Sequence, residues 1–209
     1  MSDAVAVPAT RTIGGTADQS RRNWIAITCG AGAVGGIFIA VPFVSSFAPS
    51  ERAKAAGAPV QVDIGAIKPG EKLTVEWRGK PVWIVRRTPE QLESLKKTEA
   101  QLADPTSRRT QYPTPDYAKN PHRSIKPEYF VAVGICSHLG CSPSDKFVTG
   151  AQPSLGDDWQ GGFLCPCHGS TFDIAGRVFK NKPAPDNLEV PPHMYLSDTT
   201  LVIGEDKKA

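Results

Sequence analysis

The longest apolar run of the chain covers residues 24–47 and contains no charged side chain. As an α-helix, these residues would span about 36 Å, which is enough to cross a bilayer core of about 30 Å with some tilt. Four glycines between residues 30 and 36 would allow close packing against other membrane helices, although a lone anchor in lipid would tolerate them too. The pattern predicts one N-terminal transmembrane helix.

Beyond this run, apolar residues occupy alternate positions in short segments, which is typical of β-strands. These segments are residues 60–64, 73–77, 82–84 and 129–135. The sequence Arg78-Gly79-Lys80-Pro81 predicts the turn of a hairpin. Residues 89–102 begin with a proline and are rich in helix formers, so they predict one helix packed on the sheet. We therefore expect a mainly β head with antiparallel sheets over residues 60–209.

Residues 48–59 are rich in alanine and polar residues and predict a linker between the helix and the head. The formal net charge of the whole chain is only +3, from 24 basic and 21 acidic residues. No basic block is interleaved with aromatic residues, so nucleic acid is not an expected partner. Residues 103–127 and 142–160 predict surface loops of unknown role. We expect His122 to be solvent-exposed and His193 to lie at the surface or at a strand edge.

Two short boxes hold four of the five cysteines: Cys136-Ser-His138-Leu-Gly-Cys141 and Cys165-Pro-Cys167-His168-Gly-Ser170. Two thiolates and two imidazoles could hold either a tetrahedral zinc ion or a two-iron cluster. Zinc fingers usually present cysteine pairs and histidine pairs separately. We therefore favour the iron–sulfur interpretation and keep zinc as the alternative.

The paired boxes resemble those of the Rieske family, which binds one [2Fe–2S] cluster. The resemblance implies that Cys136 and Cys165 hold the inner iron and that His138 and His168 hold the outer iron. It further implies a cluster-binding subdomain over about residues 134–182. The implied supporting groups are a disulfide between Cys141 and Cys167 and a hydroxyl of Ser170 that donates to a bridging sulfide.

Within that family, the run from Val75 to Leu92, VEWRGKPVWIVRRTPEQL, resembles the bacterial Rieske subunits of cytochrome bc1 complexes. The resemblance implies an electron carrier in a dimeric membrane complex with cytochrome b and cytochrome c1. It would take one electron from ubiquinol, with a proton coupled through a cluster histidine, and pass it to cytochrome c1, contributing to proton translocation. His168 would accept a hydrogen bond from the quinol hydroxyl, and His138 would be the other exposed ligand.

Four further expectations follow from the resemblance. Leu139, at a loop tip, is expected to dock into the quinol site, although it could instead pack back against its own head. Phe172 stands where many relatives have a tyrosine that donates to a ligand cysteine, so we expect a lower reduction potential. Pro183-Ala184-Pro185 resembles the proline loop that covers the cluster, with Lys182 in place of a common glycine. In that family, the segment that corresponds to residues 48–59 is a hinge.

Residues 20–24, SRRNW, resemble a twin-arginine export signal, although Arg21 and Arg22 could instead be only the positive flank of the helix. Both interpretations leave residues 1–23 in the cytoplasm. The head would then lie in the periplasm, across a bacterial inner membrane, where a disulfide persists. Two other classes stay open: a Rieske subunit of a molybdenum enzyme such as arsenite oxidase, and a ferredoxin-like carrier for a ring-hydroxylating oxygenase.

Overall fold

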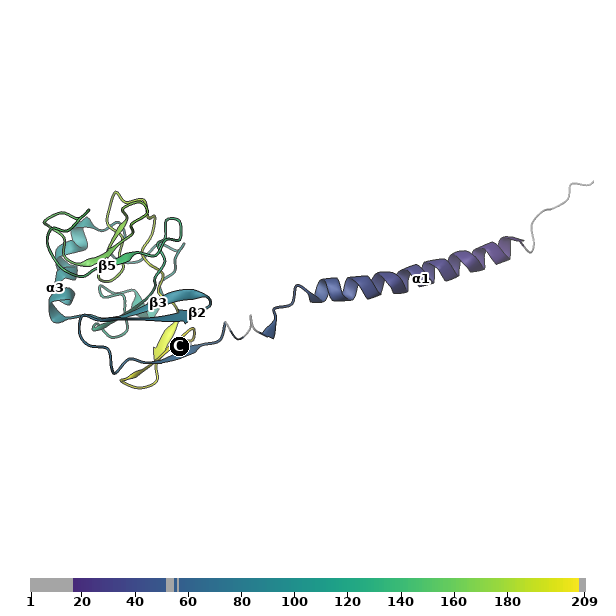
Figure 1. Cartoon of the computed structure of the whole chain (residues 1–209), viewed down its shortest axis with the longest axis horizontal. Coiled ribbons are helices and arrows are strands. Elements are labelled where there is room, and N and C mark those ends of the chain that lie inside the picture. The colour runs from purple at the N-terminus through teal and green to yellow at the C-terminus, as the bar shows by residue number, and fades with distance from the viewer. Residues whose placement is uncertain (1–16, 52–54, 56, 207–209) are drawn as a thin grey trace, which may run out of the picture. The chain divides into compact units, whose positions relative to one another are not determined.

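The protein is described by a computed structural model, which covers residues 17–51, 55 and 57–206 (Figure 1). The chain divides into two compact units, Met1–Glu51 and Arg52–Ala209. The first unit contains the long helix α1, and the second is the head. The predicted N-terminal segment 1–23 and linker 48–59 lie partly outside the described residues.

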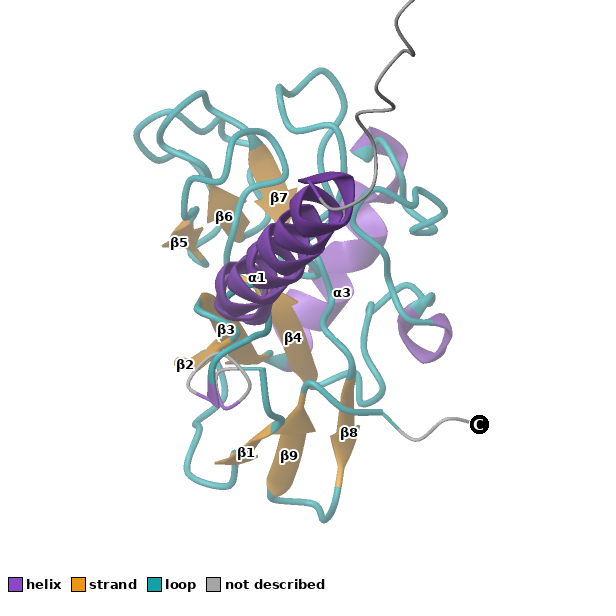
Figure 2. Cartoon of the chain, turned by 90° about the vertical axis from the view of Figure 1, so that its right-hand side faces the viewer, coloured by secondary structure: helices purple, strands orange, loops and turns teal. Residues whose placement is uncertain are grey.

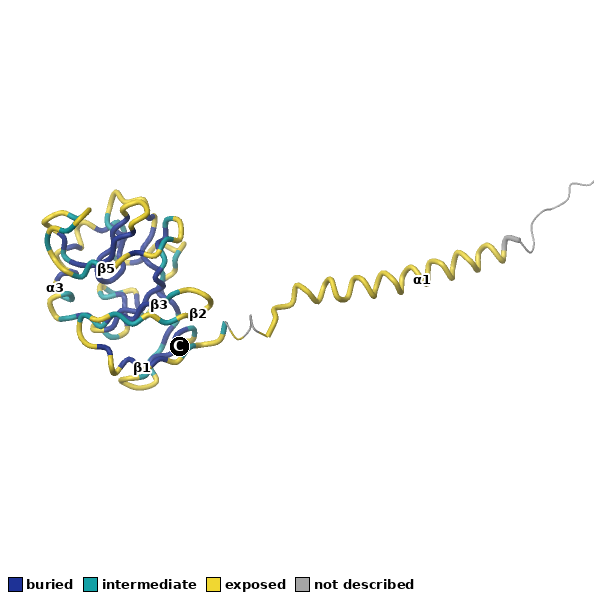
Figure 3. The backbone as a smooth tube through the Cα atoms, viewed as in Figure 1, coloured by how far each residue is buried: buried dark blue, intermediate teal, exposed yellow. Residues whose placement is uncertain are grey.

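Helix α1 runs over Ala17–Ser45 and therefore begins before the predicted span and ends two residues short of it. It includes Arg21 and Arg22 in its first turns, and Pro42 lies inside it near its end. By length and composition, Gln19–Ser45 could cross a membrane. Its described side chains are exposed throughout (Figure 3), as expected of a helix whose apolar surface is covered by lipid.

The head is built from three antiparallel sheets of three strands each, which Figure 2 shows one above another. The lower sheet has the order β1 (Val60–Asp63), β9 (Thr200–Ile203) and β8 (His193–Tyr195). The middle sheet contains β2 (Lys72–Trp77), β3 (Lys80–Arg86) and β4 (Tyr129–Val133). The upper sheet contains β5 (Ser144–Lys146), β6 (Gly162–Leu164) and β7 (Thr171–Asp173). The predicted mainly β fold is confirmed.

The predicted hairpin is formed by β2 and β3, whose register pairs Val75 with Val82 and Trp77 with Lys80. Arg78 and Gly79, between the strands, have φ angles of 52° and 69°. Two residues with positive φ give a turn whose twist matches that of the flanking strands. The conformation of this hairpin therefore depends on a few residues that are adjacent in the sequence.

Strands β3 and β4 of the middle sheet are buried on both faces, because their alternate side chains belong to two hydrophobic cores. Ile84 and Val131 share one core with Leu201 of the lower sheet. Trp83 faces the other core, where its ring stacks on Phe163 of β6 with the ring centroids 5.0 Å apart. The upper sheet is therefore fixed to the rest of the head through aromatic packing.

The predicted helix over residues 89–102 is α3 (Pro89–Thr98), followed by one turn of 3₁₀-helix, η1 (Glu99–Gln101). Its start is a capping box: Gln91 N–H donates to Thr88 Oγ1, and Thr88 N–H donates to the Gln91 side chain. A second short 3₁₀-helix, η2, covers Asp116–Ala118. Helix α3 lies beside the middle and upper sheets (Figures 1 and 2).

Candidate metal centre

Two loops with matching backbone geometry carry the predicted ligands. The first follows β4 and contains Cys136, and the second follows β6 and contains Cys165. In each loop, the glycine four positions later donates its N–H to the cysteine carbonyl: Gly140 at 3.1 Å and Gly169 at 3.0 Å. Both glycines have left-handed φ angles, 81° and 72°, which glycine adopts without steric cost. Each cysteine N–H also donates to the carbonyl five positions later, at 2.8 and 2.7 Å.

The loops bury the thiols and leave the imidazoles near the surface. The exposed fractions of Cys136 and Cys165 are 1% and 2%. His138 is partly buried and His168 is exposed, and their rings lie edge to face with centroids 4.8 Å apart. The structure therefore brings the four predicted ligands together as a thiol pair and an imidazole pair.

Burial and, to a smaller extent, the neighbouring Cys165 thiol raise the pKa of the Cys136 thiol to about 11. Without metal, this thiol therefore keeps its proton at neutral pH. Thiolate ligands must be deprotonated, so binding a metal centre would release that proton. Two adjoining buried thiols and two adjoining imidazoles fit a two-metal centre with sulfur ligands on one ion and nitrogen ligands on the other.

The predicted disulfide between Cys141 and Cys167 is present and joins the two loops. The sulfur atoms of Cys141, Cys165 and Cys167 all lie within 4.8 Å of one another. Because two of these three sulfurs are bonded to each other, they are not free thiolates. Cys165 is thus the one free thiol of this group, and the disulfide lies directly beside it.

Two buried serine hydroxyls connect the loops to the proline loop, residues 183–185. Ser170, which is fully buried, accepts the N–H of Ala184 at 3.0 Å, and its hydroxyl also lowers the pKa of Cys136 through a hydrogen bond. Ser137 donates to the carbonyl of Asp186 at 2.6 Å. The sequence analysis identified Ser170 but missed Ser137. The signal in the sequence that could have identified Ser137 is its position between the predicted ligands Cys136 and His138.

The proline loop is supported by residues 103–127, for which the sequence suggested no role. Arg109 Nη1 donates to the carbonyl of Pro185. Tyr112 N–H donates to Asp186 Oδ2 at 3.2 Å, and Asn187 Nδ2 donates to the carbonyl of Asp104 at 2.9 Å. This segment is therefore more than a surface loop: it holds the backbone at the end of the proline loop.

Arg123, in the same segment, is completely buried. Its guanidinium donates to the carbonyls of Ala175, Gly176 and Leu188 and to the Thr114 hydroxyl, at distances from 2.7 to 3.1 Å. Burial lowers its pKa to about 10, so it stays charged at neutral pH. Arg123 connects the segment before the proline loop to the segment after it.

A second buried arginine connects β7 to helix α3. Arg177 and Asp173 form an ion pair at 2.7 Å, and each side chain is 1% exposed. Arg177 Nη2 also donates to the carbonyl of Leu95, and Asp173 Oδ1 accepts the N–H groups of Ala175 and Arg177. Several hydrogen bonds therefore satisfy both charges, as buried ions require.

The expectations for the two remaining histidines need correction. His193 is 1% exposed, and its N–H donates to the Tyr117 hydroxyl at 2.9 Å. His122 is partly buried, not solvent-exposed. Burial lowers the pKa of both imidazoles. His193 does lie on an edge strand, β8, but packing against Tyr117 buries it there.

Leu139 is 71% exposed at the tip of the first loop, so the alternative that it packs against its own head is wrong.

Phe172 is completely buried in the core that contains Cys136 and Cys165. Its phenyl ring provides no hydrogen-bond donor there. Lys182 is exposed immediately before the proline loop.

Comparison with known proteins gives consistent matches. The sequence model of the Rieske [2Fe-2S] domain matches residues 108–192. The ubiquinol-cytochrome c reductase iron-sulfur subunit of Allochromatium vinosum is 58% identical over 92% of both chains. The protein of the same name from Bradyrhizobium diazoefficiens is 39% identical over 92% of this chain and 99% of its own length. A solved chain of a hyperthermophilic respiratory Complex III aligns with TM-score 0.44 and 28% identity, covering 85% of this chain and 98% of that one.

Proposed function

Because the chain belongs to the family of ubiquinol-cytochrome c reductase iron-sulfur subunits, we propose that it carries electrons from ubiquinol to cytochrome c1 in a dimeric complex with cytochrome b. The observation that carries this proposal is the pairing of two buried thiols with two imidazoles near the surface. The full-length match supports this class over a molybdenum-enzyme subunit or a ferredoxin-like carrier.

The ligand set that we propose is Cys136, Cys165, His138 and His168. The [2Fe–2S] cluster, when bound, supplies a one-electron acceptor whose potential depends on hydrogen bonds and solvent exclusion. The protein's own contribution is to exclude water with the proline loop and to direct the Ser170 hydroxyl toward Cys136. The disulfide keeps the two loops together.

We assign proton transfer to the imidazole of His168, which is exposed and so is accessible to a quinol hydroxyl. Its Nε2 would accept the hydrogen bond from the quinol and then hold the proton, which is released on the outer side after electron transfer to cytochrome c1. His138 is less exposed and would occupy the second position beside it. This division of roles follows from the unequal exposure of the two rings.

The first test is an EPR-monitored redox titration of the complex at several pH values from neutral to alkaline. Proton uptake by a histidine together with the electron makes the reduction potential fall as the pH rises, and the two imidazole ligands favour a positive value. A negative potential that does not change through neutral pH would instead indicate a ferredoxin-like carrier. A protein without any iron–sulfur signal would indicate zinc.

Leu139 is expected to form part of the docking surface for the quinol site. Replacing it with alanine should reduce quinol oxidation by the complex at least tenfold, because about 1.5 to 3 kcal/mol of apolar contact at the docked position is lost. The reduction potential should not change. Val148, which is also 71% exposed, provides the matched control. If Leu139→Ala and Val148→Ala oxidise quinol equally fast, the docking role is wrong.

Phe172→Tyr is expected to raise the reduction potential by about 60 mV, which corresponds to about 1.4 kcal/mol for a one-electron couple. A phenol hydroxyl in the core next to the ligand cysteines would donate to sulfur and stabilise the reduced state. The potential is measured by the same EPR titration. Phe179→Tyr adds a hydroxyl outside this core and should leave the potential unchanged. An unaltered potential in Phe172→Tyr would refute the assignment.

We further propose that α1 is an uncleaved membrane anchor, with the N-terminus in the cytoplasm and the head in the periplasm of the bacterial inner membrane. The twin-arginine-like sequence at residues 20–24 supports export of a head that is already folded around its cofactor. In this arrangement residues 48–59 act as the hinge on which the head moves between its two redox partners. The disulfide supports an oxidising compartment for the head.

A further inference from the structure

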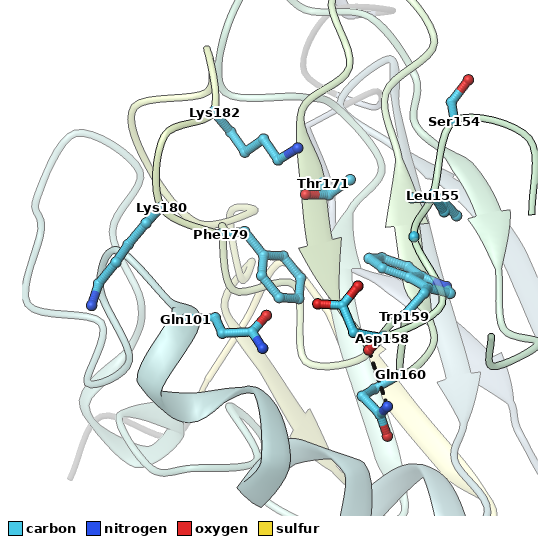
Figure 4. Close-up of a pocket in the computed structure, with 11 residues that line it drawn as sticks. Gln101, Ser154, Leu155, Asp158, Trp159, Gln160, Thr171, Phe179, Lys180 and Lys182 are labelled. Atoms are coloured by element: carbon cyan, nitrogen blue, oxygen red, sulfur yellow. Dashed lines mark hydrogen bonds between the residues drawn. The ribbon is translucent and has the colours of Figure 1, made fainter. Parts of the chain in front are cut away.

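A cavity of about 390 Å³ lies beside the cluster loops and has no role in the function described above. Its walls come from residues 154–160 between β5 and β6, from the start of β7, and from residues 179–182 before the proline loop (Figure 4). Gln101 of η1 completes the lining. The cavity therefore gives a role to the segment 142–160, for which the sequence suggested none.

Two aromatic rings form the apolar part of this cavity. Trp159 and Phe179 have ring centroids 5.8 Å apart and an interplanar angle of 39°. The indole N–H of Trp159 donates to the carbonyl of Lys146 at 2.9 Å, so the ring is held in place. This donor is already satisfied and Trp159 is only 6% exposed, so the small open part of the indole and the partly exposed ring of Phe179 offer the cavity an apolar surface.

The charged groups of the cavity are unevenly placed. The Lys182 side chain extends across the cavity toward Thr171 (Figure 4), and its ammonium makes no hydrogen bond or ion pair with any described residue. Lys180 instead points away and donates to the carbonyl of Ala100 at 2.9 Å. Asp158 also lines the cavity, and its carboxylate has no ion pair among the described residues. An anionic group is therefore favoured at Lys182 and disfavoured near Asp158.

We propose that this cavity binds a small aromatic carboxylate, with its ring against Trp159 and Phe179 and its carboxylate at Lys182. The site is contiguous with the redox centre. Thr171 directly follows Ser170, and Lys182 lies two residues before Ala184, whose N–H is bonded to the Ser170 hydroxyl. A bound negative charge here opposes the addition of an electron nearby, so occupancy lowers the reduction potential. This second effect rests on the proposed function, whereas binding itself does not.

Binding is tested on the purified full chain with its cluster in detergent, by ligand-observed NMR with benzoate as the probe. Benzoate should bind with a dissociation constant in the millimolar range, and acetate and benzyl alcohol, each lacking one recognition element, should bind at least about tenfold more weakly. Lys182→Met should weaken benzoate binding about fivefold, and Asp158→Asn should strengthen it about twofold. Lys68→Met, an exposed lysine between β1 and β2, is the matched control and should change nothing.

Equal effects of Lys182→Met and Lys68→Met, or equal binding of benzoate and acetate, would overturn the site. The regulatory effect is tested by an EPR titration without benzoate and with benzoate at its wild-type dissociation constant. The potential should fall in the wild type and should fall clearly less in Lys182→Met, which binds benzoate more weakly. Binding with an unchanged potential would overturn the coupling and leave the site standing. Neither of these two measurements tests the proposed quinol function. That function would be contradicted by a reduction potential that does not change with pH.

Discussion

Replacing Arg123 by methionine is expected to lower the free energy of unfolding of the head by about 3 to 5 kcal/mol. The substitution removes a fully buried guanidinium and leaves the carbonyls of Ala175 and Leu188 without their donor, whereas the Gly176 carbonyl keeps the N–H of Leu188. Each buried acceptor without a partner costs about 1 to 3 kcal/mol. Chemical denaturation of the full chain in detergent, followed by near-ultraviolet circular dichroism, measures the loss.

The matched control is Arg108→Met, because Arg108 lies in the same segment and is exposed. Its stability should stay within about 0.5 kcal/mol of the wild type. Arg123→Lys keeps the charge and permits a measurement if the methionine variant does not fold. Its free energy of unfolding should still fall by about 2 kcal/mol, because one ammonium group cannot make all the hydrogen bonds of the planar guanidinium. Equal stability of Arg108→Met and Arg123→Lys would show that Arg123 does not hold the proline loop.

The double variant Cys141→Ser with Cys167→Ser is expected to lose most of its cluster. The bridge connects positions 26 residues apart, and closing a loop of this length contributes about 3.5 kcal/mol by restricting the unfolded chain. Without it, the exposed loop that carries His168 is free to move away from the loop that carries His138. We expect less than about half the wild-type iron content per chain and a shorter half-life of the EPR signal at the same temperature.

Cys29→Ser is the control for this experiment, because Cys29 is exposed on α1, far along the chain from either loop. Its iron content should equal that of the wild type. A double variant that keeps its full iron content and signal half-life would mean that the serine contacts to the proline loop suffice to hold the two loops. In that case Ser137→Ala in the double-variant background should release the cluster.

Several features could be predicted because they depend only on residues close together in the chain. The β2–β3 hairpin follows from two adjacent residues that adopt positive φ, and the start of α3 follows from the capping box of Thr88 and Gln91. The ligand boxes follow from the spacing of cysteine and histidine within six residues. A membrane-spanning helix follows from one uncharged apolar run, since length and composition alone decide whether a helix can cross a bilayer.

The supports of the site could not be predicted in this way. Ser137 is bonded to Asp186, 49 residues away, and Arg123 to Leu188, 65 residues away. Such bonds have no periodicity or spacing that a sequence pattern could reveal. They form only because strand pairing in the middle and upper sheets brings the two segments side by side. The same applies to His193, which is polar in sequence but buried by Tyr117 from a distant turn.

The sequence therefore determined a helix that is able to cross a membrane, the β character of the head, and the thiols and imidazoles of the proposed ligand set. Each of these depends on side-chain chemistry and local spacing. The three-dimensional packing determined which polar groups would be buried, that Leu139 would project from the head, and that segments 103–127 and 142–160 would meet the residues around the proline loop. These outcomes depend on long-range contacts, whose free energy is gained only when the sheets are assembled and water is excluded between them.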